Sequence, residues 1–509
     1  MLARVNTFSI DGLETSPVTV EVDIRPGLPA FSVVGLGDTA IREARERVKA
    51  ALLNSGFGFP DRRIVANLAP ASLRKGGSSF DLPIAVGILA ASGQVPPEPL
   101  EGLAVFGELS LTGALRACRG TLAVAQAARA RGLQGLVVAR SRAREAALVE
   151  DLAILPPATL REVVEVLSGG EAPSLPAPAA PARAATPSAT DLDFRDVRGH
   201  AGAAEALRVA AAGGHNILLS GPPGTGKTML ARRLPSILPP LTRAEAIEVT
   251  RIASVAGVHR GDGLVERRPF RAPHHTISPS GLVGGGGWPQ PGEATLAHHG
   301  VLFLDELSEF SRVALEALRQ PLEDGRVAIV RGQQTAVYPT RFMLVAATNP
   351  CPCGFAGELE RCRCTETDLA RHARRLSGPL MDRIDITVNV HRPSAEALGA
   401  SPGTESAKIR AAVVEARERQ AARLEGTGVG CNANMDAKLV RRDAPLDEEG
   451  EAVLAAAYER TQLSARGHER VLKVARTIAD LAGSDRVRAE HVGQALTLRG
   501  QERTLEVVA

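Results

Sequence analysis

A glycine-rich segment near the middle of the chain has residue types that bind phosphate groups. The apolar run 216–220 leads into the sequence GPPGTGKT, and an apolar helical pattern follows it. Backbone N–H groups of such a loop turn inward around phosphate oxygens, and the following helix points its amino end at them. A glycine loop that served only as a turn would need neither the lysine nor the threonine, so we predict a P-loop. Its residues are Gly221, Pro222, Pro223, Gly224, Thr225, Gly226, Lys227 and Thr228.

Two carboxylates follow a second short apolar run. Residues 301–304 read as a buried strand that ends in Asp305 and Glu306, and open α/β sheets bind ligands at the carboxyl ends of their strands. We expect Lys227 to reach the outer phosphates of ATP, and Thr228 and Asp305 to hold Mg²⁺. Glu306 is then the expected base that orients the attacking water. A surface acidic pair is the alternative, but the four apolar residues before it argue against that reading.

A third apolar run, 342–347, is followed by Thr348 and Asn349. Parallel strands bring their carboxyl ends to one edge of a sheet, so Asn349 is expected between the metal and the terminal phosphate. We predict that Asn349 is a polar sensor of the nucleotide.

The composition is that of a soluble globular protein with several domains. The 509 residues are 44% apolar and 23% charged. The formal net charge is +3, so a nucleic-acid surface must be a local patch. The amino end shows no secretory leader, and no run of about 18 apolar residues occurs. We therefore expect a cytoplasmic protein with no membrane partner.

Changes in pattern along the chain predict four regions. Residues 1–168 mix strand and helix patterns and predict an α/β domain, and 169–190 form a linker rich in alanine and proline. Residues 191–393 alternate strands and helices, which predicts a parallel sheet around the P-loop. Residues 394–509 read as a helical lid. The helices expected in this lid are 406–424, 446–458, 464–481 and 488–498.

Several longer motifs point to a known family. They are HHTIS at 274–278, PGEATLAHHGVLFLDEL at 291–307, ATNPCPCG at 347–354 and SGPLMDRID at 377–385. With these motifs, the chain resembles the AAA+ ATPases, within them the magnesium-chelatase-like group, and in that group the ComM/YifB family. The resemblance covers nearly the whole chain. It implies an AAA+ core with a helical lid, assembled as a hexameric ring.

The resemblance also assigns two arginines. Arg383 stands in the sequence LMDRID, where related proteins have an arginine that acts on the phosphate of a neighbouring subunit. Its permanently charged, planar group suits the charge that spreads over a transferring phosphoryl group. A salt bridge to Asp382 or Asp385 is the alternative. Arg466 opens a helix like a second sensor motif that reaches phosphate, and Arg476, in the middle of that helix, is a weaker candidate.

Two segments carry candidate contacts to DNA. The interval between Lys227 and Asp305 is rich in glycine, proline and histidine and resembles an inserted pore loop. Its candidates are Arg267, Arg268 and Arg271 for phosphates and Trp288 for base stacking. Trp288 filling a gap under the loop is an equal alternative. Residues 326–338 read as a hairpin whose tip carries Arg331, unless this is only a solvated hairpin.

Four of the six cysteines crowd into one segment. Cys351, Cys353, Cys362 and Cys364 form two Cys-x-Cys pairs across a short loop. Four thiolates could close a tetrahedral Zn²⁺ site that supports the loop after Asn349. Unliganded cytosolic thiols are the alternative, because the commoner zinc spacing is Cys-x-x-Cys.

The first domain resembles the proteolytic domain of Lon-type enzymes, through GSSFDL at 77–82 and GELSLTG at 107–113. That chemistry needs a serine and an activating lysine. Ser79 falls at the serine position of the resemblance, but Leu122 stands at the lysine position. We therefore expect an inactive relative of the protease.

Two functions stay open from the sequence. The ComM/YifB resemblance implies an ATP-hydrolysing hexameric motor, a branch-migration helicase acting on branched or single-stranded DNA in recombination during natural transformation. The alternative is a protein-remodelling ATPase like the magnesium chelatase I subunit. That subunit is expected to resemble this chain only from the P-loop domain onward, so the first domain favours the DNA motor. Both functions use ATP and Mg²⁺.

Overall fold

The computed structural model divides the chain into two compact units. The residues that it describes are 1–35, 39–71, 73, 75, 77–177, 192–259, 263–286, 289–331, 334–356, 361–376, 380–399, 402–461 and 463–499. The first unit contains Met1–Ala182, Arg243–Val265 and Gly332–Val337, and the second contains Arg183–Thr242, Glu266–Arg331 and Tyr338–Ala509. Most of the predicted linker 169–190 lies outside the described residues.

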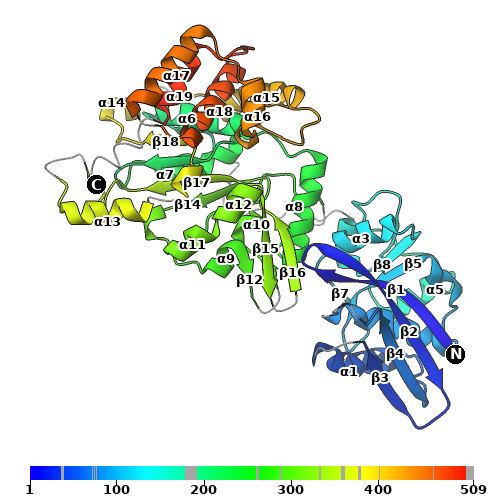
Figure 1. Cartoon of the computed structure of the whole chain (residues 1–509). Coiled ribbons are helices and arrows are strands. Elements are labelled where there is room, and N and C mark those ends of the chain that lie inside the picture. Colours follow the sequence, from blue (N-terminus) through cyan, green and yellow to red (C-terminus); the bar gives the residue numbers. More distant parts are fainter. Residues whose placement is uncertain are drawn as a thin grey trace. The chain divides into compact units, whose positions relative to one another are not determined.

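A seven-stranded mixed sheet forms the centre of the first unit, in the order β3-β4-β2-β1-β5-β8-β9 (Figure 1). Its strands are β1 Leu2–Asp11, β2 Glu14–Arg25, β3 Ala30–Val34, β4 Arg63–Ala69, β5 Leu103–Phe106, β8 Gly135–Val138 and β9 Ala153–Leu155. A small second sheet pairs β6 Glu108–Leu109 with β7 Leu115–Arg116. β1 and β2 form an antiparallel hairpin, and Gly12 in its turn has a φ of 62°. The mixed α/β fold predicted for this part is confirmed.

Helices complete the first unit. They are α1 Thr39–Asn54, α2 Asp81–Ala91, α3 Thr121–Ala130, α4 Ala143–Ala146, α5 Leu160–Leu167 and α8 Arg243–Ala256. Every residue of α2 is buried, and its Asp81 carboxylate accepts a hydrogen bond from Arg47 at 2.8 Å. Helix α8 packs against α3, where the Gly120 N–H donates to Ser254 Oγ at 3.0 Å. Residues 243–265 thus belong to the first unit, although their position in the sequence lies within the predicted P-loop domain.

The second unit has a five-stranded parallel sheet at its centre, as predicted, in the order β11-β14-β17-β10-β18. Its strands are β10 Ile217–Ser220, β11 Phe270–Arg271, β14 Val301–Leu304, β17 Met343–Thr348 and β18 Ile386–Asn389. Side chains of a strand alternate between its two faces. Ile217 and Leu219 therefore enter one hydrophobic cluster, and Leu218 enters another.

Helices cover both faces of this sheet (Figure 1). Those that precede the predicted lid are α6 Ala201–Gly213, α7 Lys227–Arg233, α9 Pro279–Val283, α10 Glu293–Leu296, α11 Arg312–Ala317, α12 Arg319–Asp324 and α13 Glu366–Leu376. Two small sheets pair β12 Gly284–Gly285 with β13 Gln290–Pro291, and β15 Arg326–Arg331 with β16 Gln334–Pro339.

The predicted lid is helical. Its helices are α14 Ala395–Gly399, α15 Ser406–Arg423, α16 Ala437–Asp443, α17 Glu448–Thr461, α18 Ala465–Leu481 and α19 Ala489–Thr497. The four predicted helices are present within a few residues. Helices α14 and α16 were not predicted, because five and seven residues are too few for a clear period.

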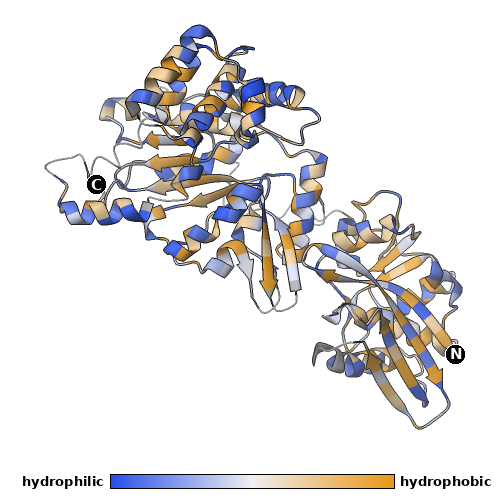
Figure 2. Ribbon diagram, in the orientation of Figure 1, coloured by the Kyte–Doolittle hydropathy of each residue, from blue (hydrophilic) through white to orange (hydrophobic). Residues whose placement is uncertain are grey.

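The hydropathy of the elements explains these layers. The strands of the five-stranded sheet are drawn mostly in orange, whereas α13 is mostly blue (Figure 2). Among the described residues, no helix is both long enough and apolar enough to cross a membrane.

Candidate nucleotide site

The predicted P-loop lies between β10 and α7, and its backbone explains its glycines. Gly224 and Gly226 have φ values of 77° and 88°, which residues with a side chain rarely adopt. A Cβ on Gly221 would overlap the carbonyl oxygen of Val390. The loop therefore turns tightly and delivers the chain into the first turn of α7, which begins at Lys227.

Lys227 folds back over this loop. Its Nζ donates to the carbonyl oxygens of Gly221 and Pro222, at 2.6 and 2.9 Å, and to Asn349 Oδ1 at 3.2 Å. Burial lowers the pKa of Lys227, and the carboxylate of Asp305 opposes that shift. The ammonium group thus lies between the loop and the predicted sensor, where an outer phosphate could replace the carbonyl oxygens as its partner.

The predicted magnesium ligands meet directly. Thr228 Oγ1 donates to Asp305 Oδ2 at 2.7 Å, across the gap between α7 and the end of β14. Neighbouring oxygens around an octahedral Mg²⁺ lie about 2.9 Å apart, because each Mg–O distance is about 2.1 Å. The spacing of the two oxygens therefore fits adjacent positions on one ion.

Glu306 has an unusual backbone and an unexpected neighbour. Its φ is 53°, and its side chain is 56% exposed. The His275 ring reaches it, with Nδ1 at 3.3 Å from Glu306 Oε2. A base that orients water needs this access to solvent, and His275 can hold its carboxylate in one direction. In the sequence, His275 stands within the motif HHTIS, which by itself predicts no role for it.

A second histidine that the sequence did not reveal supports Asn349. The ring nitrogen Nε2 of His372, on α13, lies 2.9 Å from the backbone oxygen of Asn349. Burial is the main reason that the pKa of His372 is lowered. The neutral ring can therefore donate one hydrogen bond that fixes the backbone of Asn349.

Arg383 and Arg466 lie at the opposite edge of the sheet from the P-loop. The backbone oxygen of Arg383 accepts a hydrogen bond from the side chain of Asn216, at 2.9 Å. Asn216 immediately precedes β10, whereas the P-loop follows it. Arg466 lies 4.0 Å from Asp382, the residue before Arg383. Both arginines are thus at the amino edge.

The surroundings of these two arginines differ. The Arg383 side chain is 10% exposed and pairs with Glu323, rather than with either of the aspartates considered from the sequence. Burial and then the charges of Arg319, Arg466 and Arg470 lower its pKa. Arg466 is 71% exposed. Several arginines thus gather at the amino edge, where Glu323, Asp382 and Asp385 offset part of their charge.

Arg476, the weaker candidate for a phosphate contact, is part of an internal network. It is 1% exposed and donates to Asp480 Oδ1 at 2.9 Å and to the backbone oxygen of Asp485 at 2.6 Å. Its donors thus stabilise the helical region.

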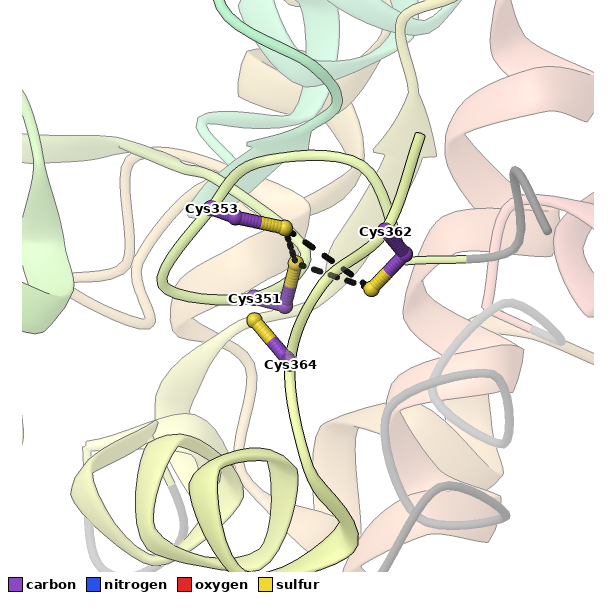
Figure 3. Close-up of side chains that lie close together, drawn as sticks. All are labelled: Cys351, Cys353, Cys362 and Cys364. Carbon is purple, nitrogen blue, oxygen red and sulfur yellow. Dashed lines mark hydrogen bonds between the residues drawn. The ribbon is translucent and has the colours of Figure 1, made fainter. Parts of the chain in front are cut away.

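The four clustered cysteines lie together on the loop between β17 and α13 (Figure 3). The sulfur of Cys351 lies 3.4 Å from that of Cys353 and 4.0 Å from that of Cys362. All four sulfurs, including that of Cys364, lie within 4.8 Å of one another. A tetrahedral Zn²⁺ with Zn–S distances of about 2.3 Å holds its sulfurs about 3.8 Å apart. The cluster therefore has the dimensions of a metal site.

The predicted DNA contacts have different outcomes. Arg268 donates to three backbone oxygens, those of Pro239, His299 and Pro240, at 2.6, 2.7 and 3.2 Å. Arg271 forms a double ion pair with Glu293. These bonds engage both guanidinium groups within the chain, which weakens the case for phosphate contacts there.

The other predicted DNA contacts and the protease-like site give less information. Trp288 and the side chain of Arg331 lie outside the described residues. Arg267 stays a prediction. In the first unit, Leu122 is buried in α3 with 1% exposure, so no amine occupies the position of the expected lysine.

Comparison with known proteins gives the family. A family model described as magnesium chelatase, subunit ChlI, matches residues 193–398, and its C-terminal counterpart matches 403–499. The chain is 42% identical to the competence protein ComM of Haemophilus influenzae over 510 residues, which cover 99% of both chains. It is also 42% identical to the uncharacterized protein YifB of Salmonella typhimurium over 507 residues, 99% of this chain and 98% of YifB. The chain belongs to the ComM/YifB family of magnesium-chelatase-like proteins.

Two further matches cover only part of the chain. A model described as subunit ChlI of magnesium chelatase matches residues 20–142 of this ComM/YifB member. The Lon protease 2 of Bacillus subtilis is 30% identical over 144 residues, 26% of each chain. The first of these matches contradicts the expectation that a chelatase-like subunit would resemble the chain only from the P-loop onward.

Proposed function

We propose that this ComM/YifB member is a Mg²⁺-dependent ATPase that assembles as a hexameric ring and uses ATP hydrolysis to move branched or single-stranded DNA. One observation carries the ATPase part. Lys227 and Thr228 at the start of α7, Asp305 after β14 and Asn349 after β17 meet at one edge of the sheet, and each lies within 3.2 Å of a partner in the group. The family supports the same activity.

Each side chain at this edge has a task in hydrolysis. Lys227 binds the outer phosphates, and Asn349 reads the terminal one. Thr228 and Asp305 would hold Mg²⁺, which neutralises phosphate charge when it is bound. Glu306 accepts a hydrogen bond from the attacking water and so directs its oxygen at the terminal phosphorus.

Arg383 and Arg466 serve the nucleotide of a neighbouring subunit. The length of strand β10 separates their edge from the P-loop. Its four residues rise about 3.3 Å each, so the strand is roughly 13 Å long. That separation keeps both guanidinium groups from the phosphates of their own chain. A head-to-tail ring brings the amino edge of one subunit to the carboxyl edge of the next.

DNA is the proposed substrate because of family membership. A relative that matches over 99% of its length is named a competence protein. We propose branch migration during natural transformation because the family resemblance implies it. The test is ATP-driven movement of a synthetic four-way DNA junction by the purified full-length protein, with Glu306→Gln as the control. We expect movement only with the unchanged protein. Robust ATP hydrolysis without junction movement would contradict the DNA part.

A second candidate is a protein-remodelling ATPase like the magnesium chelatase I subunit. The family models that match residues 20–142, 193–398 and 403–499 all carry the chelatase description. The first domain therefore does not separate the two functions. A partner protein that stimulates ATP hydrolysis more than junction DNA does would favour this candidate.

Zn²⁺ is the second metal that we propose for the chain. Sulfur distances of 3.4 to 4.0 Å among three of the four cysteines match a tetrahedral thiolate site. The N–H of Ala356 also donates to Cys351 Sγ at 3.2 Å, a support that thiolate ligands commonly receive. Metal analysis of freshly purified protein is the direct test, with one zinc ion per chain expected.

A further inference from the structure

The four-cysteine loop touches the P-loop. Gly354 is buried, has a φ of 87°, and approaches Pro223 so closely that a Cβ on it would lie 2.5 Å from Pro223 Cδ. Contacts this short leave no room for any side chain at residue 354. The backbone between Cys353 and Phe355 is therefore packed directly against the second proline of the P-loop.

The same loop also begins at the sensor. Asn349 binds Lys227 through its side chain at 3.2 Å, and its backbone oxygen lies 2.9 Å from His372 Nε2. Cys351 follows only two residues later. The loop thus meets the nucleotide site twice, at Asn349 and at Gly354, and two of the clustered thiols lie between these contacts.

The other two thiols, Cys362 and Cys364, lie at the end of the loop, where it leads into α13. Cys362 lies 4.0 Å from Cys351 and 3.7 Å from Cys353, sulfur to sulfur, just before α13 begins at Glu366. A metal bound by all four sulfurs would tie the end of β17 to the start of α13. Without it, short-range contacts alone must hold Asn349 and Gly354 in position.

We propose that a Zn²⁺ ion held by Cys351, Cys353, Cys362 and Cys364 positions the P-loop and the sensor for ATP. The metal acts through the loop: it fixes Gly354 against Pro223 and Asn349 beside Lys227. Loss of the metal weakens nucleotide binding while the P-loop sequence stays intact. This inference rests on the proposed ATPase function and adds a structural metal that controls it.

The first test removes single ligands from the full-length protein. Cys353→Ser and Cys364→Ser are expected to lose zinc and to bind a fluorescent ATP analogue at least about tenfold more weakly, as for lost supporting groups around other sites. Cys118→Ser, in the first unit, is the matched control and should keep both zinc and affinity. Circular dichroism of each variant checks that it is folded.

The second test keeps the ligands and disturbs the contact. Gly354→Ala should retain zinc but bind the ATP analogue more weakly, because its new methyl group overlaps Pro223. Gly428→Ala is the matched control, since Gly428 has a φ of 73° with no atom within 4 Å of an added Cβ. Both variants place alanine in the left-handed region, at φ values of 87° and 73°, and only Gly354→Ala meets the P-loop.

The outcomes separate this inference from the proposed function. If the ligand variants do not fold, a chelator titration of the unchanged protein replaces them, with zinc added back to restore binding. Zinc absent from the freshly purified protein overturns the inference, and so does unchanged ATP affinity after zinc removal. Failure of the zinc-loaded protein to bind ATP would instead overturn the proposed function.

Discussion

The two edges of the five-stranded sheet balance their charges differently. At the carboxyl edge, Lys227 bonds to Asn349 and Thr228 bonds to Asp305, so the polar groups satisfy one another. At the amino edge, the neighbouring positive charges of Arg319, Arg466 and Arg470 contribute to the lowered pKa of Arg383. Under the proposed function, the carboxyl edge surrounds the phosphates, and the amino edge of a neighbouring subunit neutralises them. Each chain would then supply parts of two sites, and a neighbour would complete each one.

The largest effect is expected at the amino edge. Arg383→Ala should lower kcat for ATP hydrolysis by about 10³-fold, the lower range for loss of an arginine finger. ATP should still bind, because the P-loop of each chain is unchanged. Steady-state hydrolysis and equilibrium binding of a fluorescent ATP analogue measure the two quantities.

Arg476→Met is the control for that variant. It removes another arginine of the second unit, one that bonds to Asp480 and the backbone within the helical region. We expect a loss of about 3 kcal/mol in the free energy of unfolding, as for a broken buried ion pair. Turnover per folded subunit should stay near the original value. A loss of turnover as large as that of Arg383→Ala would remove the distinction between the two arginines.

At the carboxyl edge, Glu306→Gln comes next in size. The amide cannot accept the proton of the attacking water, so hydrolysis should slow by about 10²-fold, within the range for a lost general base. Nucleotide affinity should stay the same or rise, and the ATP-bound state should accumulate. Hydrolysis at the original rate would exclude Glu306 as the base.

Lys227→Ala should act on binding. A hydrogen bond to a charged group contributes about 2 kcal/mol, so the Kd for ATP should rise by about 30-fold. Isothermal titration with a non-hydrolysable analogue measures this. An unchanged Kd would show that the carbonyl oxygens of Gly221 and Pro222 remain the partners of this lysine when nucleotide is bound.

The smallest effect is expected at His275. Its ring lies 3.3 Å from Glu306 and positions the carboxylate without touching phosphate. His275→Ala should lower kcat about fivefold at constant KM, since one polar contact of this kind contributes about 1 kcal/mol. His275→Gln should recover part of the loss, because its amide can still donate. A change in KM alone would argue for a role in binding.

The sequence revealed the carboxyl edge better than the amino edge. The P-loop, the Asp305–Glu306 pair and Asn349 each follow a short apolar strand, so local pattern and the geometry of parallel strands suffice to bring them together. The pairing of Arg383 with Glu323 and the ring of His372 beside Asn349 depend on packing between distant elements. The pattern of apolar residues within one helix or strand does not predict such contacts.

The boundaries of the units show the same limit. Residues 243–265 follow the P-loop in sequence, yet they belong to the first unit, where Ser254 meets Gly120 of the chain's first domain. No helix was predicted there, because the interval between Lys227 and Asp305 was expected to be an inserted pore loop, whereas the structure has α8 over Arg243–Ala256. Which element the apolar face of α8 packs against depends on the tertiary structure. The approach of Gly354 to Pro223 is another, because a single glycine does not reveal what lies against it.

Mixing two inactive variants tests the divided site most directly. Glu306→Gln damages only the carboxyl edge, and Arg383→Ala damages only the amino edge. In a randomly mixed ring at equal amounts, about a quarter of the interfaces join an intact Glu306 to an intact Arg383. The account predicts that ATP hydrolysis returns to a substantial fraction of the original rate on mixing. No recovery, with mixed rings shown to form, would contradict the claim that neighbouring subunits share the site.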